Sequence, residues 1–259
     1  MNIDRLMIIP QRDDLREYVK LAKENSLGFE YNDFFFPGIL GDESESDKLI
    51  ELYGLSENRP LFSTMHGAFF DVTVFSDDPL IKSASELRVT QSLEIAKKLG
   101  VKGVVFHTNY IPNFLQKGYR DAWVEKNAVF WKKKAQEYPM LDIYMENMFD
   151  TDWELIARLG SKMEDCPNFG ICLDYAHAQV FGEAGDIEKW VVELAPYVKH
   201  LHINDNNLCE DMHQAVGDGS IDWQSFKHYH DKYFTEATVL IEVTGLEKIK
   251  QSLEYLSKL

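Results

Sequence analysis

The chain is predicted to fold as a single (β/α)8 barrel with its functional site at the carboxyl ends of the strands. Short β-like runs alternate with helical stretches eight times along 259 residues. Each strand-plus-helix unit takes roughly 30 residues, as it does in such barrels. Because no low-complexity linker or change of composition divides the chain, we expect one domain over residues 1–259.

The eight expected strands are compact runs rich in Val, Ile, Leu, Phe or Met, which is typical of parallel strands buried on both faces. They are Asp4–Ile9, Leu27–Tyr31, Leu61–His66, Lys102–His107, Leu141–Glu146, Phe169–Asp174, Lys199–Asn204 and Val239–Val243. Helices are expected between them, and the later ones are Trp123–Tyr138, Trp153–Met163, Ile187–Leu194, Trp223–Tyr233 and Leu246–Leu256.

The helix after the third strand has recognisable ends. Asp78-Pro79 predicts its start and Gly100 predicts its stop. Within Ser85–Leu99, the residues expected to face the barrel are Leu87, Leu93, Ile95, Ala96 and Leu99. Later in the chain, residues 204–221 form a long stretch rich in Asn, Asp and Gly. Long irregular loops in compact domains tend to be functional.

The composition indicates a soluble globular protein. A hydrophobic content of 45% with 27% charged residues permits a sizeable core. No apolar run reaches 18 residues, so we expect neither a transmembrane helix nor a membrane partner. The three cysteines (Cys166, Cys172 and Cys209) indicate no disulfide framework, and the first residues lack a signal layout, so a cytoplasmic location is expected. The formal net charge of -16 disfavours polyanionic partners.

Six successive strands end in a side chain that can bind a metal ion. These residues are His66, His107, Glu146, Asp174, His202 and Glu242, roughly 30 to 40 residues apart. Three more groups follow closely behind two of them: His177, Asp211 and His213. A barrel gathers its strand ends around one opening. We therefore expect all nine groups to converge on one site.

Five imidazoles and four carboxylates are about twice what one tetrahedral zinc ion needs. Such nitrogen and oxygen donors suit zinc, manganese, iron or cobalt. The sequence therefore predicts one to three divalent ions per chain, zinc or manganese being the expected metals. A structural alternative exists for Asp174, since an acid after a strand often caps the next helix. His200 is expected to lie farther from the centre than His202, and His228 and His230 are expected at the surface of a helix.

These residues resemble the xylose isomerase-like TIM-barrel superfamily, which contains sugar phosphate isomerases and epimerases and endonuclease IV-type proteins. The matching segments are Met65-His66-Gly67-Ala68-Phe69, Val105-Phe106-His107, Met145-Glu146-Asn147, Cys172-Leu173-Asp174-Tyr175-Ala176-His177, Leu201-His202-Ile203-Asn204-Asp205, Asp211-Met212-His213, Gly217–Trp223 and Ile241-Glu242. Each segment is short, and the specificity lies in their order and spacing.

The resemblance implies two competing chemistries. In the isomerases and epimerases it implies a metal held by Glu146, Asp174, His202 and Glu242, with Glu146 and Glu242 also transferring a proton at a sugar carbon next to a carbonyl. In the endonuclease class it implies three zinc ions bound by all nine groups, which hydrolyse a phosphodiester at an abasic site. A third possibility is a barrel that binds a metabolite without catalysis.

The loops at the expected mouth favour a small carbohydrate over nucleic acid. They are acidic, with Glu183, Asp186, Asp205, Glu210, Asp211 and Asp218 in the sixth and seventh loops, and only Arg12, Lys117, Arg120 and Lys248 are expected to approach the mouth. A nucleic-acid enzyme must neutralise several phosphates. The sequence predicts no particular oligomeric state.

Aromatic and amide side chains in these loops are candidates for binding a sugar. The aromatic residues are Phe34, Phe35, Phe36, Phe69, Phe70, Tyr110, Tyr175 and Phe181, and they could instead be core residues under long loops. Asn109, Asn147, Asn204 and Asn206 are candidate hydroxyl binders. Among all of these, Asn109, Asn147 and Phe69 are the predicted substrate-binding residues.

Overall fold

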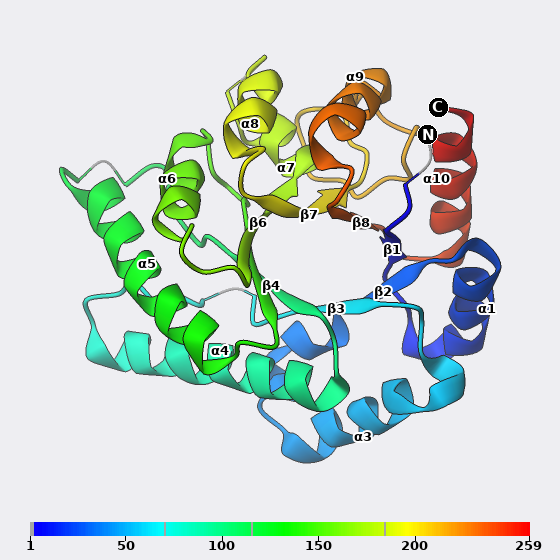
Figure 1. Cartoon of the computed structure of the whole chain (residues 1–259), viewed down its shortest axis with the longest axis horizontal. Helices are drawn as coiled ribbons and strands as arrows, with labels where there is room; N and C mark the ends of the chain where they lie inside the picture. Colours follow the sequence, from blue (N-terminus) through cyan, green and yellow to red (C-terminus); the bar gives the residue numbers. More distant parts are fainter. Residues whose placement is uncertain (1–2, 70, 115, 184) are drawn as a thin grey trace.

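The computed structural model describes residues 3–69, 71–114, 116–183 and 185–259, and it contains a closed barrel of parallel strands (Figure 1). Neighbouring strands pair in sequence order, and β1 pairs with β8 to close the barrel. The predicted fold class is confirmed. The strands are β1 (Leu6–Ile8), β2 (Gly28–Tyr31), β3 (Ser63–His66), β4 (Gly103–His107), β5 (Asp142–Glu146), β6 (Phe169–Asp174), β7 (Val198–Ile203) and β8 (Thr238–Ile241).

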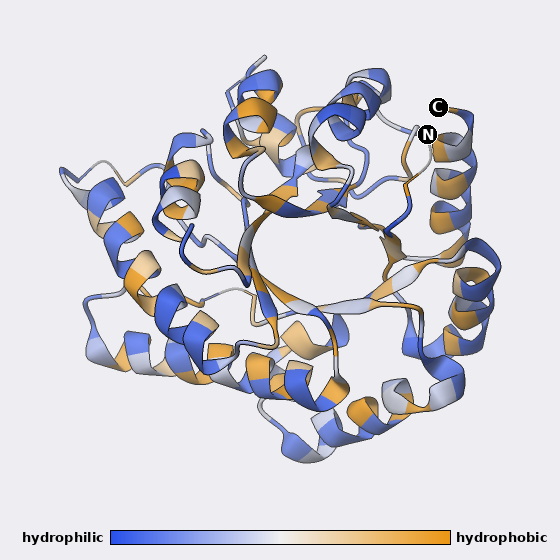
Figure 2. Cartoon of the chain, viewed as in Figure 1, coloured by the Kyte–Doolittle hydropathy of each residue, from blue (hydrophilic) through white to orange (hydrophobic). Residues whose placement is uncertain are grey.

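Helices surround the barrel and present polar residues outward (Figure 2). The α-helices are α1 (Leu15–Asn25), α2 (Pro37–Leu40), α3 (Glu43–Gly54), α4 (Pro79–Leu99), α5 (Tyr119–Glu137), α6 (Glu154–Lys162), α7 (Tyr175–Val180), α8 (Ile187–Leu194), α9 (Trp223–Tyr229) and α10 (Leu246–Lys258). Short 3-10 turns occupy Arg12–Asp14, Asp33–Phe35 and Ser56–Asn58, and a π-helical segment, His230–Phe234, continues α9. No helix in the described ranges is long and apolar enough to cross a membrane.

Helix α4 begins and ends where its sequence predicts. The Asp78 carboxylate accepts hydrogen bonds from the first turn, Pro79 occupies a first-turn position, and Gly100 adopts a left-handed φ of 74°. The predicted inward stripe is wrong at Leu87, whose side chain is 57% exposed. A separation of six residues rotates Leu87 about 240° from the buried Leu93, at roughly 100° per residue, so the two residues lie on different faces of the helix.

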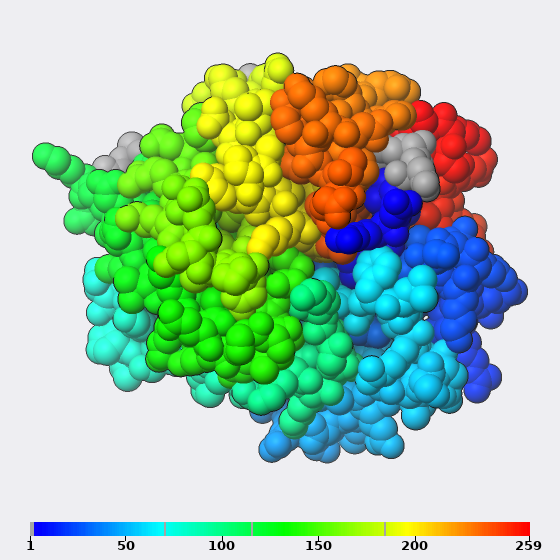
Figure 3. Space-filling view, viewed as in Figure 1, coloured from blue at the N-terminus to red at the C-terminus, as the bar shows by residue number. Residues whose placement is uncertain are grey.

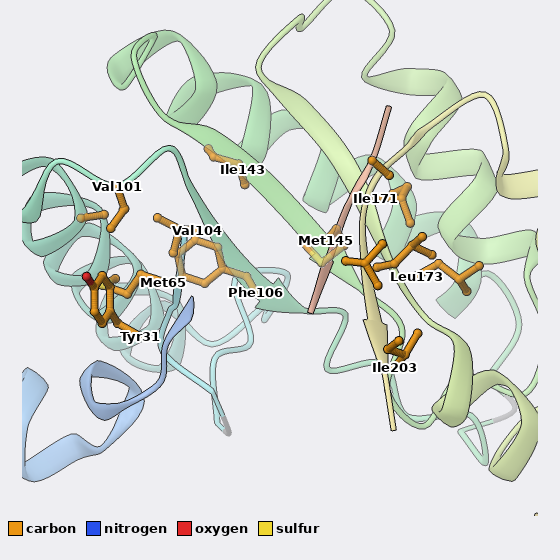
Figure 4. Close-up of a cluster of buried hydrophobic side chains, with 14 of the residues drawn as sticks. Tyr31, Met65, Val101, Val104, Phe106, Ile143, Met145, Ile171, Leu173 and Ile203 are labelled. Atoms are coloured by element: carbon orange, nitrogen blue, oxygen red, sulfur yellow. The ribbon is translucent and has the colours of Figure 1, made fainter. Parts of the chain in front are cut away.

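One layer of the core lies between the strands and the helices. Alternate strand residues, among them Met65, Phe106, Met145 and Leu173, belong to a single buried cluster with helix residues (Figure 4). Phe106 illustrates the packing, since its ring lies 5.0 Å from that of Trp131 on α5. Aromatic and aliphatic burial of this kind provides most of the free energy that holds helices to a sheet.

The opposite set of alternate residues fills the barrel interior. Contacts between non-adjacent strands identify them: the ring of Tyr144 on β5 stacks on that of His200 on β7 at 5.2 Å, and Thr64 on β3 contacts Met7 on β1. The space-filling view shows that atoms occupy the centre that the ribbon leaves open (Figure 3). Inward-facing side chains recur at every second residue of a strand. The inward-facing residues two positions farther along these strands are therefore the ones nearest the carboxyl end of the barrel.

Two of the histidine predictions outside the centre have different outcomes. His228 is exposed, as expected. The prediction that His230 lies at the surface is wrong, because its side chain is 4% exposed and lies near Phe226. The π-helical turn begins at this residue.

Candidate metal centre

The structure brings all nine predicted ligands together. His66, His107, Glu146 and Asp174 are the last residues of β3, β4, β5 and β6, while His202 and Glu242 lie at the ends of β7 and β8. His177 lies on α7, and Asp211 and His213 lie in the loop after β7. They form three groups with potential ligand atoms within 4.8 Å of one another: His66, His107 and Glu146; Glu146, Asp174, His202 and Glu242; and His177, Asp211 and His213.

The first group, which we call the first donor set, consists of His66, His107 and Glu146. The Nε2 atoms of the two histidines lie 3.1 Å apart. Glu146 Oε2 lies 3.2 Å from His107 Nε2 and 3.6 Å from His66 Nε2. The two imidazole nitrogens and the carboxylate oxygen form a triangle of potential ligand atoms, which suits a divalent cation.

The second group, the central donor set, consists of Glu146, Asp174, His202 and Glu242. His202 Nδ1 lies 3.4 Å from Glu146 Oε1 and 3.5 Å from Glu242 Oε1. Glu146 therefore directs one oxygen to the first donor set and the other to the central one. A carboxylate in this position can bridge two metal ions.

Asp174 caps a helix and also directs an oxygen toward the candidate centre. Its Oδ1 accepts a hydrogen bond from the His177 backbone N at 2.6 Å and so caps α7. Its Oδ2 has no hydrogen-bond partner. The cap fixes the direction of the second oxygen toward the centre.

The third group, the outer donor set, consists of His177, Asp211 and His213. Asp211 Oδ2 lies 3.3 Å from His177 Nε2 and 3.2 Å from His213 Nε2. This set is the most exposed of the three, because Asp211 and His213 come from the loop after β7.

Buried polar atoms without partners make the centre a candidate cation site. Both oxygens of Glu146, Oδ2 of Asp174, Nδ1 of His202 and Oε2 of Glu242 make no hydrogen bond. Burying such atoms unpaired costs roughly 1–3 kcal/mol each, and more for charged groups. Their concentration at one point, in a nitrogen and oxygen donor set, fits divalent metal ions such as zinc or manganese.

The imidazoles are oriented by their second nitrogens. The Nδ1–H of three histidines donates to a backbone carbonyl: His66 to Gly67 at 3.1 Å, His177 to Asn147 at 3.1 Å and His213 to Glu242 at 2.8 Å. His107 Nδ1 contacts Met148 Sδ at 2.9 Å. These contacts leave the Nε2 lone pairs directed to the donor sets. His202 is reversed, with Nδ1 facing the central donor set and Nε2 facing Glu30.

Without a bound metal ion, the nearby carboxylates favour the protonated form of two of the histidines. Burial opposes protonation of His213, but its hydrogen bond to Asp211 and the charge of Glu242 raise its pKa to about 10. Burial likewise opposes protonation of His177, and the charge of Asp174 together with the Asp211 hydrogen bond raises its pKa well above the usual value. Burial raises the pKa of Asp174 and the charge of His177 lowers it, so these two neighbours compete for a proton. Bound cations would displace these protons.

The loop after β7 is organised around Asp205, which was expected to contribute to an acidic rim. The carboxylate is instead completely buried. It accepts hydrogen bonds from four groups: Asn206 N at 2.9 Å, Gly217 N at 2.9 Å, Ile221 N at 3.2 Å and Trp223 Nε1 at 2.7 Å. A backbone bridge to Gln214 adds two more bonds. Asp205 thus fixes the loop that carries Asp211 and His213.

Glu30 on β2 is a functional candidate that the sequence reasoning missed. It is completely buried inside the barrel and contacts His200, His202 and Thr64. Burial opposes ionisation, but the charges and hydrogen bonds of the two histidines lower the pKa of Glu30 well below its usual value. The available signal was a lone acid within the apolar run Leu27–Tyr31. His200 lies one alternation deeper than His202, as expected.

Two of the three predicted substrate-binding residues are engaged in loop contacts. Asn109 Nδ2 donates to Phe69 O at 3.2 Å and Val72 O at 3.1 Å. Asn147 Nδ2 donates to Asp174 O, and Asn147 Oδ1 accepts from Asp174 N. These contacts hold strand ends together, and substrate binding by either amide stays a prediction. Asn204 differs, since neither atom of its buried amide has a hydrogen-bond partner.

Some of the predicted mouth aromatics border the first donor set. The Phe69 ring lies 4.6 Å from His107, and the Phe35 ring lies 5.5 Å from His66. Both rings line a pocket of about 620 Å³ that also includes Phe36 and Arg88. Phe34 and Tyr175 are core residues, the alternative that the sequence allowed, and Phe70 lies outside the described residues.

Most of the positively charged side chains expected at the mouth contact acidic side chains or backbone carbonyls. Arg120 forms a bidentate pair with Asp152 at 2.7 and 2.8 Å, and Arg12 lies 3.9 Å from Asp33. Lys248 donates to the His213 carbonyl, and Lys117 is exposed. Arg88 was not expected near the mouth because it lies within α4.

The chain belongs to the xylose isomerase-like TIM barrel family, whose family model matches residues 19–259. Three solved structures share its fold. They are the Thermus thermophilus protein TTHB071 soaked with ZnCl2 (22% identity, 98% of this chain and 97% of that chain, TM-score 0.77), a D-tagatose 3-epimerase-like protein (21%, 98% and 96%, 0.76) and endonuclease IV from Thermus thermophilus (18%, 98% and 100%, 0.67). The superfamily resemblance stated from the strand-end motifs is confirmed.

Proposed function

We propose that the protein is a divalent-metal-dependent isomerase or epimerase of a small sugar or sugar phosphate. One observation carries the proposal: Glu146 and Glu242, from strands β5 and β8, converge on the same nitrogen of His202. Both carboxylates are buried at the carboxyl ends of their strands. Proton transfer at a carbon next to a carbonyl can use one such group to take the proton and the other to return one.

Glu146 and Glu242 are assigned the proton transfer. One carboxylate takes the proton from the carbon next to the substrate carbonyl, and the other returns a proton to that carbon or its neighbour. Bound divalent ions would polarise the carbonyl and the adjacent hydroxyl. The Phe35 and Phe69 rings would exclude water beside the sugar, since both border the first donor set.

The surroundings support a small substrate, phosphorylated or not. The acidic mouth offers a duplex few free cations, because Arg120 and Arg12 have carboxylate partners. Arg88 lines the adjoining pocket, and no ion pair to it occurs among the described residues. A guanidinium there would suit the phosphate of a sugar phosphate. The D-tagatose 3-epimerase-like protein of the same fold is consistent with this class.

Solvent-deuterium exchange tests the proposal. A panel of ketoses, aldoses and their phosphates is incubated in deuterium oxide with zinc- or manganese-loaded protein, and deuterium at carbon is measured by NMR. The proposal expects exchange with at least one member and none with Glu242→Gln. Absence of exchange across the whole panel with a fully loaded protein would refute it.

A zinc-dependent endonuclease acting at abasic sites is the second candidate. The observation that favours it is that the first and outer donor sets flank the central one, so that three ions could act on one phosphodiester. The similarity to endonuclease IV is consistent with it. Incubation with an abasic oligonucleotide, with and without a chelator, tests this candidate, and metal-dependent nicking would replace our proposal with it.

A further inference from the structure

His202 differs from the other four histidines in what holds its second nitrogen. In three of those histidines a backbone carbonyl accepts from Nδ1, and His107 contacts a methionine sulfur. His202 instead directs Nε2 to a carboxylate oxygen, Glu30 Oε1, at 3.3 Å. The contact is a close ion pair and not an aligned hydrogen bond, and neither of its two atoms makes a hydrogen bond to any other group.

Glu30 is itself held by neighbours in the barrel interior. Thr64 Oγ1 donates to Glu30 Oε2 at 2.7 Å, and His200 Nε2 lies 3.1 Å from the same oxygen. His200 is fixed in turn by Thr238 Oγ1 at 2.5 Å from its Nδ1 and by the ring of Tyr144. Glu30, His200 and His202 are completely buried. The Glu30 carboxylate therefore has little freedom to leave His202.

We propose that Glu30 is a positioning residue of the metal centre, which accepts the Nε2–H of His202 and so keeps the Nδ1 lone pair directed at the central donor set. Carboxylates that accept from a metal-binding histidine fix its tautomer and ring orientation and raise its basicity. Glu30 reaches no other predicted ligand and is too deep to touch a substrate at the mouth. The inference rests on the metal binding proposed for the centre and is independent of the reaction.

A different use of the same region would be a separate metal site. Cys172, His200 and His202 also lie close enough to share an ion. Both nitrogens of His200, however, already face hydrogen-bond partners, and His202 Nε2 faces Glu30. The Glu30 carboxylate faces both histidines on this side, so the geometry favours a polar network here over a separate metal site.

Zinc titration of the intact protein at buffered free concentrations tests the inference, with bound ions counted by elemental analysis. Glu30→Gln keeps the size of the side chain and removes its charge. One binding step should then move to about 10- to 100-fold higher free zinc. The step that belongs to the outer donor set should stay unchanged. In cobalt-loaded protein, the visible absorption of the central ion should change in the same variant.

Asp150→Asn is the matched control. Asp150 is also a buried carboxylate, held by Thr108 Oγ1 at 2.6 Å and Met148 N at 3.0 Å, and contacts no residue of the central donor set. Its central zinc step should match that of the wild type. If Glu30→Gln fails to fold, Thr64→Val decides, because it removes one donor to Glu30 and should shift the same step in the same direction by a smaller factor.

Three results would overturn the inference. The first is an unchanged central step in Glu30→Gln, or in Thr64→Val where only that variant folds. The second is an ion bound by Cys172, His200 and His202 in addition to those of the three donor sets. The third is a wild-type protein that binds no divalent ion. That result would refute the metal centre itself, whereas the first result would refute only the role of Glu30.

Discussion

Replacing Asp205 with Asn should loosen the loop that carries two of the nine ligands. Each carboxylate oxygen of Asp205 accepts two hydrogen bonds, Oδ1 from Asn206 N and Ile221 N, and Oδ2 from Gly217 N and Trp223 Nε1. An asparagine offers one oxygen and one NH2 group. Whichever way the amide turns, it therefore places an N–H against two N–H donors.

The expected cost follows from those contacts. Two buried donors lose their acceptor at roughly 1–3 kcal/mol each, so the free energy of unfolding should fall by about 2–6 kcal/mol. A change of 1 kcal/mol shifts Tm by about 2–4 °C in a protein of this size, which predicts a decrease on the order of 10 °C. Because Asp211 and His213 follow Asp205 in this loop, the ion of the outer donor set should be lost first.

Urea unfolding and elemental analysis of bound zinc measure the two effects. Asp218→Asn is the control, since Asp218 lies in the same loop but is exposed and accepts from Gln251. It should leave both stability and metal content near wild type. An Asp205→Asn protein with wild-type unfolding and full zinc content would show that the four hydrogen bonds do not hold the loop.

The remaining predictions concern the centre, the adjoining pocket and the core. Glu242→Gln and Glu146→Gln should each abolish turnover while circular dichroism stays unchanged, and full activity in either would contradict the proton-transfer roles. Because the pKa of His213 is raised to about 10, zinc binding at pH 7 should release protons and strengthen about tenfold per pH unit for each proton displaced. Calorimetric heats that do not depend on the buffer would contradict this. In the metal-free protein the same imidazolium stabilises the fold below about pH 6.5, and that contribution is lost as the pH rises through about 10. Arg88→Gln should raise KM for a phosphorylated substrate roughly tenfold or more and leave KM for the free sugar unchanged. Leu93→Ala should cost about 2–5 kcal/mol of unfolding free energy, whereas Leu87→Ala should change it by less than about 0.5.

The candidate centre could be predicted from sequence because of barrel geometry. The carboxyl ends of parallel strands meet at one opening, so a polar residue that follows an apolar run has a known location. Glu146 and Asp174 could thereby be placed on neighbouring strands without any structure. Asp211 and His213 could be included only through their long loop, and the hydrogen bonds of Asp205 that position the loop could not be read from spacing.

The failures have physical causes. Glu30 lies within an apolar run, and only the closure of the barrel places it 3.3 Å from His202. Leu87 was expected to face the barrel because it is apolar. Its exposure depends on which face of α4 it occupies, and that is set by its rotation about the helix axis. His230 looked exposed because its helix was expected outside the barrel, yet the π-helical turn buries it. The errors at Glu30 and His230 concern contacts that only the folded chain makes, whereas the error at Leu87 concerns the rotation of one residue about its own helix axis.

Charge connects the metal count to the choice of substrate. Four carboxylates (Glu146, Asp174, Asp211 and Glu242) belong to the three donor sets. A single divalent ion would leave them in excess, and the site would repel a phosphate unless nearby histidines stayed protonated. Three divalent ions exceed the four carboxylates in charge, and the field at the opening would then attract an anionic group despite the acidic surface. The number of ions held at working metal concentrations therefore bears on which substrate the same nine side chains accept: a neutral sugar with one ion, a phosphorylated one with three.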